Sequence, residues 1–186
     1  MMTLLIVLAI LGVIVALMYN FLIAKKNEVD NIYGGIDALF KNRYNLIPNL
    51  VQSVKQYVTH ERETLEKITQ YRTQAMEAKS SDETLELNNK LGSMLGGVSV
   101  AMEEYPDLKA NENFLHLQKS LNEIEAQISA ARRAYNQAVT DYNNAIEMFP
   151  TNILAKYMKY QRKGVFEVSE ETQKDNPDVK DIFKSS

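Results

Sequence analysis

The residues best suited to chemistry in this chain are its two histidines, each with a carboxylate nearby in the sequence. His60 is followed directly by Glu61, and His116 lies four residues after Glu112. A di-iron carboxylate bundle needs four inward carboxylates and two Glu-x-x-His pairs, and neither histidine has that spacing. Adjacent residues on a helix project about 100° apart, so His60 and Glu61 form a poor chelate. We therefore expect no metal site and no cofactor.

Nucleophilic and phosphate-binding chemistry also lack a motif. A Ser-His-Asp triad would need a nucleophile elbow or a comparable context, and a phosphate loop would need glycines between a strand and a helix. The sequence contains no convincing strand and no cysteine, which excludes cysteine nucleophiles, thiolate metal sites and disulfides. Its net charge of −3 gives no reason to expect a nucleic-acid partner. We predict that the protein is not an enzyme, and a cryptic metal-dependent or hydrolytic enzyme is the alternative.

A repeated Tyr-Asn pair is the remaining candidate for a binding site. Tyr135-Asn136 recurs seven residues later as Tyr142-Asn143, close to Arg132. Apolar residues around it alternate in steps of three and four over five heptads, the period of a coiled-coil seam: Phe114, Leu117, Leu121, Ile124, Ile128, Ala131, Tyr135, Ala138, Tyr142, Ala145 and Phe149. We expect both tyrosines to point into a bundle, Arg132 to meet a carboxylate or a backbone carbonyl, and the asparagines to need hydrogen-bond partners. A surface binding site is the alternative.

The elements that position these residues are expected to be helices. A chain of 186 residues with four prolines and no tryptophan is composed like a helical protein of one domain. Apolar residues recur with a 3.6-like spacing from Asn27 to Ala78, and Pro48 is expected to kink this helix rather than to reverse it. Ser80 and Glu83 have the spacing of a capping box that opens the next helix, which runs to Glu104. Glycines in that helix weaken it or let a neighbour approach closely: Gly92, Gly96 and Gly97.

The N-terminal segment indicates its own environment. From Leu4 to Ile23 it reads LLIVLAILGVIVALMYNFLI, 20 residues without a charge. At about 1.5 Å per residue such a helix spans the roughly 30 Å of bilayer hydrocarbon, so we expect it to cross the membrane. A cleaved signal peptide competes with this interpretation, but a basic n-region, a shorter apolar core and a small-x-small cleavage site are not evident. Lys25 and Lys26 follow at once, and the positive-inside rule then places the C-terminal domain in the cytoplasm.

Two features predict a homo-oligomer. Small side chains and one amide share a face of the membrane helix, where neighbouring backbones can approach closely: Ala9, Gly12, Ala16 and Asn20. Alanine and glycine are common in membrane helices, so chance is the alternative. The membrane-proximal helix, with Val29, Ile36 and Phe40 among its apolar residues, needs a partner that a short second helix does not reach, either another subunit or a C-terminal helix from Thr151 to Lys163.

The chain is expected to divide into three parts and to form an all-α fold. These parts are a membrane anchor at residues 1–26, a helical bundle at 27–163 and a polar C-terminal tail at 164–186. The fold predicted is an N-terminal transmembrane helix followed by an antiparallel bundle of long helices with coiled-coil-like packing. The tail is expected to lie along the bundle at Val165 and Phe166 and then to become mobile.

Three separated strings carry unusual residue combinations: NRYNLIPNLVQSVKQYVTHERETL (42–65), EEYPDLKANENFLHLQ (103–118) and ARRAYNQAVTDYNNAIEMFPTNILA (131–155). They resemble the LemA family, bacterial proteins with one N-terminal membrane anchor and a helical domain. The resemblance implies a bundle of long antiparallel helices and brings no agreed catalytic activity or cofactor. The positions that match the family pattern are Arg43, Leu46, Ile47, Pro48, Asn49, Leu50, His60, Glu61, Tyr105, Pro106, Asp107, Asn111, Arg132, Tyr135, Asn136, Tyr142, Asn143 and Pro150.

Departures from the family pattern bear on any polar cluster. Asn45 stands where an acid often precedes LIPNLV, and Ala126 and Gln127 stand where polar Asn and Arg are usual. A cluster that used those side chains is therefore in doubt.

These observations together predict a non-catalytic scaffold or interaction protein in the bacterial cytoplasmic membrane. It is single-pass and self-assembling, with the lipid bilayer, its own copies and an unidentified envelope protein as partners. A sensor or adaptor for a membrane partner is the alternative.

Overall fold

The structure is a computed structural model that describes residues 1–57, 62–101 and 105–166, and these residues form helices and connecting segments without a strand. The helices are α1 (Met2–Lys55), α2 (Arg62–Glu77), α3 (Ser81–Ala101), α4 (Pro106–Lys109), α5 (Glu112–Glu147) and α6 (Thr151–Tyr157). The predicted all-α fold is confirmed.

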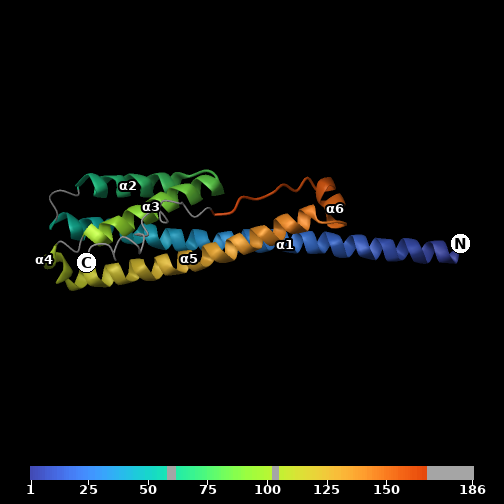
Figure 1. Cartoon of the computed structure of the whole chain (residues 1–186), viewed down its shortest axis with the longest axis horizontal. Coiled ribbons are helices and arrows are strands. Elements are labelled where there is room, and N and C mark those ends of the chain that lie inside the picture. The colour runs from blue at the N-terminus through green and yellow to red at the C-terminus, as the bar shows by residue number, and fades with distance from the viewer. Residues whose placement is uncertain (58–61, 102–104, 167–186) are drawn as a thin grey trace, which may run out of the picture.

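Two long antiparallel helices, α1 and α5, form the axis of the molecule (Figure 1). The hairpin of α2 and α3 covers the half of this pair that is distant from the N-terminus, and α4 closes that end. At the other end α6 turns back beside α1, and the chain after it runs along the bundle in an extended path. Beyond α6 the N-terminal part of α1 projects alone, so the bundle and the apolar run share one helix (Figure 1).

The core is built from one continuous face of α1 and one of α5. Buried residues of α1 recur in steps of three, four and seven, as one face of a helix requires: Leu22, Val29, Ile36, Phe40, Tyr44, Ile47, Leu50 and Val54. Val29, Ile36 and Phe40 are thus covered within a single chain. The expectation that this apolar face needs another subunit is wrong, because α5 extends past the short hairpin and covers it.

The heptad positions of α5 differ in burial. Seven of them are buried, namely Phe114, Leu121, Ile128, Tyr135, Ala138, Tyr142 and Ala145. Leu117, Ile124 and Ala131 are half-buried against the core. Phe149 is exposed, which corrects its assignment to the seam, because α5 ends at Glu147 and the chain turns away before this residue.

Pro48 lies inside α1, which continues to Lys55 without a reversal. The chain turns back between Lys55 and Arg62, so the single predicted helix from Asn27 to Ala78 is two helices. A proline lacks the N–H that would bond the carbonyl four residues earlier, here that of Tyr44. Arg72 of α2 supplies the missing donor, because its Nε bonds the Tyr44 carbonyl oxygen at 2.7 Å. The proline therefore exposes a backbone acceptor on which α2 docks.

The capping signal that was predicted for α3 is present with one change. The Glu83 amide donates to Ser80 Oγ at 3.2 Å, as in a capping box. The Glu83 carboxylate accepts from the Lys79 amide at 3.0 Å, one residue before the expected partner. The helix is described as far as Ala101, and its predicted end at Glu104 lies outside the described residues.

We predict that Arg72→Met lowers the free energy of unfolding by about 1.5 to 3 kcal/mol, the usual worth of a hydrogen bond from a charged donor. In a Pro48→Ala background the new N–H at position 48 satisfies the Tyr44 carbonyl, so the same substitution should cost markedly less. Urea denaturation of the full chain in detergent measures this double-mutant cycle. Arg62→Met, which removes an exposed pair with Glu66, is the control and should cost less than about 1 kcal/mol. An equal cost of Arg72→Met in both backgrounds would contradict the assignment.

Candidate functional site

Arg43 of α1 is fully buried although it carries a charge. Its Nη1 donates to Glu125 Oε1 of α5 at 2.7 Å. Its Nη2 donates to the carbonyl oxygen of Asn88 in α3 at 3.1 Å and also to the side-chain oxygen of that residue. The guanidinium lies over the Phe40 ring, 5.2 Å from its centroid. A buried cation is tolerated only when it is paired and hydrogen-bonded, and here one guanidinium ties three helices together.

Asn88 is the second centre of this buried network. Its Nδ2 donates to the Tyr44 hydroxyl and to the Thr84 carbonyl oxygen, the latter at 2.7 Å. Burial raises the pKa of Tyr44, although the bond to Asn88 acts in the opposite direction. The neutral phenol therefore serves as a structural acceptor and is no candidate for a nucleophile at neutral pH. The sequence signal for this network is the pair of polar residues Thr84 and Asn88, spaced by four on one helix face, and the predicted site residues did not include them.

Gly92 explains how the guanidinium fits between the helices. A Cβ at this position would lie 3.3 Å from Arg43 Nη1 and 3.6 Å from Glu125 Oε2. No such neighbour lies within 4 Å of a Cβ built at Gly96 or Gly97. The close approach that the sequence suggested for these glycines is therefore found at Gly92 and not at the other two.

The two asparagines of the Tyr-Asn repeat hold an extended segment, residues 161–166, along α5. Asn143 Nδ2 donates to the Lys163 carbonyl oxygen at 3.0 Å, and the Lys163 amide donates back to Asn143 Oδ1 at 3.0 Å. Asn136 makes the same pair of bonds with Phe166, at 3.0 and 2.7 Å. The Tyr142 hydroxyl donates to the Gln161 carbonyl oxygen at 3.1 Å. Each asparagine thus replaces the backbone of a neighbouring strand.

The spacing of the repeat matches the spacing of the segment that it holds. Seven residues of helix rise about 10.5 Å at 1.5 Å per residue. Three residues of extended chain, the step from Lys163 to Phe166, span about 10 Å at 3.3 Å per residue. The two asparagine side chains therefore stand in register with every third residue of an extended chain. We call Asn136, Asn143 and Tyr142 the peptide clamp.

An aromatic cluster completes the clamp at its distal end. Phe166 is buried, and its ring meets that of Tyr135 edge to face, with centroids 5.2 Å apart and planes at 78°. The guanidinium of Arg132 lies over the Phe166 ring, 5.2 Å from its centroid. Burial, with the nearby charge of Arg43 as a smaller cause, lowers the pKa of Arg132. Among the described residues the partner of Arg132 is thus a ring, where a carboxylate or a carbonyl was expected.

The Tyr-Pro-Asp motif forms the turn between α3 and α5. Pro106 occupies the first turn of α4 and Asp107 follows it, while Leu108 fills the core and Tyr105 packs against it. Asn111 caps α5, because its side chain accepts from the Phe114 amide at 3.1 Å. The Asn111 amide group also donates to the Tyr57 hydroxyl at 3.2 Å, at the end of α1. This motif is structural.

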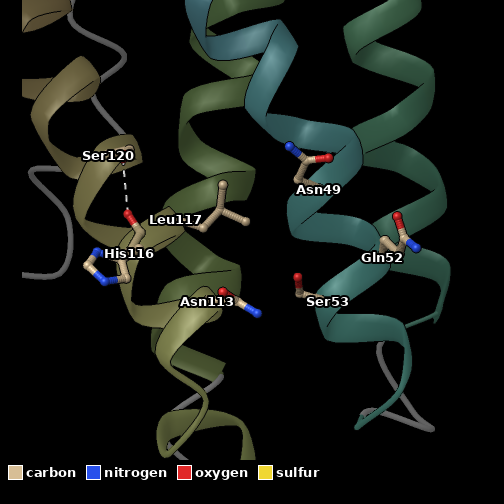
Figure 2. Close-up of a pocket in the computed structure, with 7 residues that line it drawn as sticks. All are labelled: Asn49, Gln52, Ser53, Asn113, His116, Leu117 and Ser120. Carbon is tan, nitrogen blue, oxygen red and sulfur yellow. Dashed lines mark hydrogen bonds between the residues drawn. The ribbon is translucent and has the colours of Figure 1, made fainter.

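A polar hollow of about 430 Å³ lies between α1 and α5. Figure 2 shows the side chains that line it. Asn49, Ser53 and Asn113 point toward it, whereas the His116 imidazole points away. The Ser120 hydroxyl donates to the His116 carbonyl oxygen at 3.0 Å, an ordinary bond within one helix turn. Serine and histidine side chains are therefore near each other without a nucleophile–base contact, which leaves the hollow without a catalytic arrangement.

The remaining predicted residues fall outside these sites. Among the described residues no group of three His, Cys, Asp or Glu side chains could hold a metal ion. His60 and Glu61 lie outside the described residues, so their placement is not compared. The stripe of Ala9, Gly12, Ala16 and Asn20 lies on the exposed part of α1. Pro150 follows a cis peptide bond in the turn between α5 and α6.

Comparison with known proteins gives a consistent result. Residues 33–180 match the family model described as the LemA family. Over 153 residues the chain is 33% identical to Protein LemA of Metamycoplasma hominis, covering 81% of this chain and 69% of that protein. Over 175 residues it is 24% identical to magnetosome protein MamQ 2 of Paramagnetospirillum magneticum, covering 80% of this chain and 64% of that protein. The chain thus spans less than two thirds of the length of this magnetosome relative.

We predict opposite outcomes for two alanine substitutions in α3. Gly97→Ala should raise the free energy of unfolding by about 0.5 to 1 kcal/mol, because alanine is the better helix former and its Cβ meets nothing. Gly92→Ala should lose that gain, because its Cβ crowds a guanidinium that three hydrogen bonds hold in place. Chemical denaturation of the two variants in detergent measures the difference. Equal stabilisation by both substitutions would show that Arg43 moves freely.

We also predict that Asn143→Ala releases the segment at residues 161–166. The substitution removes two hydrogen bonds worth about 1 kcal/mol each, which corresponds to a roughly tenfold to thirtyfold larger open population. Trypsin cleavage after Lys163, followed by mass spectrometry, should accelerate by that factor. Asn144→Ala, at an exposed neighbouring position, is the matched control and should leave the rate unchanged. Equal rates in the two variants would mean that the clamp does not hold the segment.

Proposed function

The chain belongs to the LemA family, and from this premise we propose that it is a non-catalytic scaffold of the bacterial envelope that assembles with its own copies. It is a membrane-associated helical protein, and the finer role is inferred here. One observation carries the proposal: α1 is an uninterrupted helix of 54 residues that includes both the apolar run and the central strut of the bundle. A continuous helix transmits orientation without a flexible joint, so a bundle on such a helix is held at a defined position relative to the membrane.

Two parts of the structure favour a structural role over a catalytic one. Arg43 bonds Glu125 and Asn88, and Asn88 bonds Tyr44, so these buried groups are hydrogen-bonded within the protein, apart from Arg43 Nε, which has no partner among the described residues. A cavity of about 320 Å³ adjoins this network at Gly92 and Glu125, and its lining includes Leu95 and Phe114. The open hollow between α1 and α5 contains no nucleophile–base pair. Among the polar residues of the family motifs, Arg43 and Asn111 connect helices, and Asn136 and Asn143 hold the extended segment, which is what a rigid scaffold needs.

Self-assembly is supported by the anchor. Ala9, Gly12, Ala16 and Asn20 share one face, and a Cβ built at Gly12 has no neighbour within 4 Å. Small residues let helix backbones approach closely in lipid, and an amide such as Asn20 gains from a partner across the interface. Rotational symmetry about the membrane normal would let all anchors insert in parallel. We place the protein in the cytoplasmic membrane as a single-pass protein with its bundle in the cytoplasm, because Lys25 and Lys26 follow the run.

A sensor or adaptor role is the second candidate, and the peptide clamp favours it. The clamped segment is held mainly by side chains and not by helix packing, so it can be released without unfolding α1 or α5. A sensor requires a partner that reads such a change. Purification from native membranes separates the two candidates: a second protein in stoichiometric amount supports the adaptor, and the chain by itself supports the scaffold.

We predict that the full chain in detergent is an oligomer by light scattering at micromolar concentration. Gly12→Leu combined with Asn20→Leu should lower its mass toward that of a monomer, because bulk replaces the close contact and the amide partner is lost. Val7→Leu, on the opposite face of the same exposed run, is the control and should not change the mass. If the unsubstituted protein is monomeric, the proposed self-assembly is wrong. If it is an oligomer whose mass the double substitution does not change, the anchor plays no part in the assembly.

A further inference from the structure

The corner between α5 and α6 exposes large apolar side chains that the bundle does not need. Outside α1, seven large hydrophobic residues are exposed in the described chain, and four of them lie in this corner. Met148 is 63% exposed, Phe149 79%, Ile153 65% and Tyr157 86%. Such a concentration on one turn marks an interaction surface rather than the scattered exposure of an ordinary protein surface.

This corner lies beside the end of the apolar run of α1. A groove of about 360 Å³ is lined by Phe21 and Lys25 of α1 together with Met148, Phe149 and Pro150 of the corner. Lys25 Nζ also pairs with Asp141 Oδ2 of α5 at 3.4 Å. Figure 1 shows α6 and the end of α5 at the place where α1 leaves the bundle. The corner therefore stands at the level of residues 21–25 along the anchor.

That level coincides with the edge of the bilayer when α1 spans it. The uncharged run from Leu4 to Ile23 fills the roughly 30 Å of hydrocarbon, so Phe21 lies within about one helix turn of its boundary. Any group beside Phe21 then meets the interfacial zone of the lipid. Bulky apolar and aromatic side chains are favoured in this zone, as are cations that reach the headgroups. Lys26, Lys156 and Lys159 provide such cations near the corner, and Lys26 lies over the Tyr160 ring of the same region.

We propose that the α5–α6 corner is a second membrane contact, which inserts Phe149 and Ile153 into the bilayer interface beside the anchor. A single rigid spanning helix fixes the height of the bundle above the membrane but lets the bundle rotate about the helix axis. A second contact beside that axis fixes which side of the bundle faces the membrane. The corner is continuous with the membrane-exposed surface of α1, so lipid reaches it without any further partner. The inference rests on α1 crossing the membrane and does not depend on self-assembly.

The chain contains no tryptophan, which allows a direct test with single tryptophans in the full-length protein. Phe149→Trp reports on the corner, Leu11→Trp on the anchor and Leu115→Trp on an exposed apolar site at the distal end of α5. Each variant is reconstituted in phosphatidylcholine vesicles containing some phosphatidylglycerol, at a low ratio of protein to lipid. Lipids brominated near the headgroup end of the acyl chain serve as the quencher. We expect several-fold quenching for Phe149→Trp and at most slight quenching for Leu115→Trp, while lipids brominated near the chain end should quench Leu11→Trp.

A second substitution tests whether insertion depends on the apolar corner. Ile153→Asp in the Phe149→Trp background should reduce the quenching several-fold, because insertion of the corner would then bring a charged carboxylate into the bilayer interface. Met76→Asp in the same background alters an exposed apolar residue away from the corner, and it should leave the quenching unchanged. Both positions are exposed, so neither substitution disturbs the core.

The possible outcomes are distinct. Quenching of Leu11→Trp with a water-like emission from Phe149→Trp overturns the second contact and leaves the anchor intact. A blue-shifted but unquenched Phe149→Trp also overturns it, since a second copy or another part of the protein then covers the corner. Absence of quenching in Leu11→Trp shows that α1 does not span the bilayer and removes the premise together with the inference.

Discussion

The arrangement of the distal half of the bundle depends on the burial of one guanidinium. Arg43 has no exposure, so its hydrogen bonds to Glu125 and Asn88 must form whenever α1, α3 and α5 pack together. Apolar faces alone tolerate sliding of one helix along another, since hydrophobic contact is non-directional. A buried cation does not tolerate it, because a shift of one helix turn would leave the charge without partners. Gly92 provides the space that this contact requires.

A second principle of this structure is that side chains satisfy backbone groups where regular structure is interrupted. Pro48 removes the helical donor for the Tyr44 carbonyl, and Arg72 of α2 replaces it. Residues 161–166 have no neighbouring strand, and Asn136 and Asn143 replace one. Buried backbone N–H and C=O groups require hydrogen-bond partners, so each interruption needs a side chain from a distant part of the chain to supply one. Pro48, Asn136 and Asn143 of the family motifs thus act where elements of the fold join.

Properties that depend on local sequence were predictable, and pairings between distant segments were not. The helical class, the capping residue Ser80 and the burial of Tyr135 and Tyr142 follow from periodicity and spacing, which act within a few helix turns. The periodicity also extended the seam to Phe149, since a regular pattern does not reveal where a helix ends. The partner of Arg132 is Phe166, more than 30 residues away, and no spacing rule connects them. Ala126 and Gln127, which depart from the family pattern, do not affect the buried network around Arg43. Both residues are exposed, and Glu125 supplies the carboxylate that pairs with Arg43.

The two halves of the bundle are therefore stabilised by different means. In the distal half α2 and α3 pack on α1 and α5, and Arg43 links α1, α3 and α5, whereas in the proximal half α6 and the clamped segment cover α1 and α5 (Figure 1). Lys163 adds an ion pair with Asp30 of α1, so the segment bridges both long helices. Regions with few buried apolar contacts open at lower free energy than a packed core. Residues 161–166 are attached mainly through side-chain hydrogen bonds, so this cover can detach while the buried faces of α1 and α5 keep the two helices aligned.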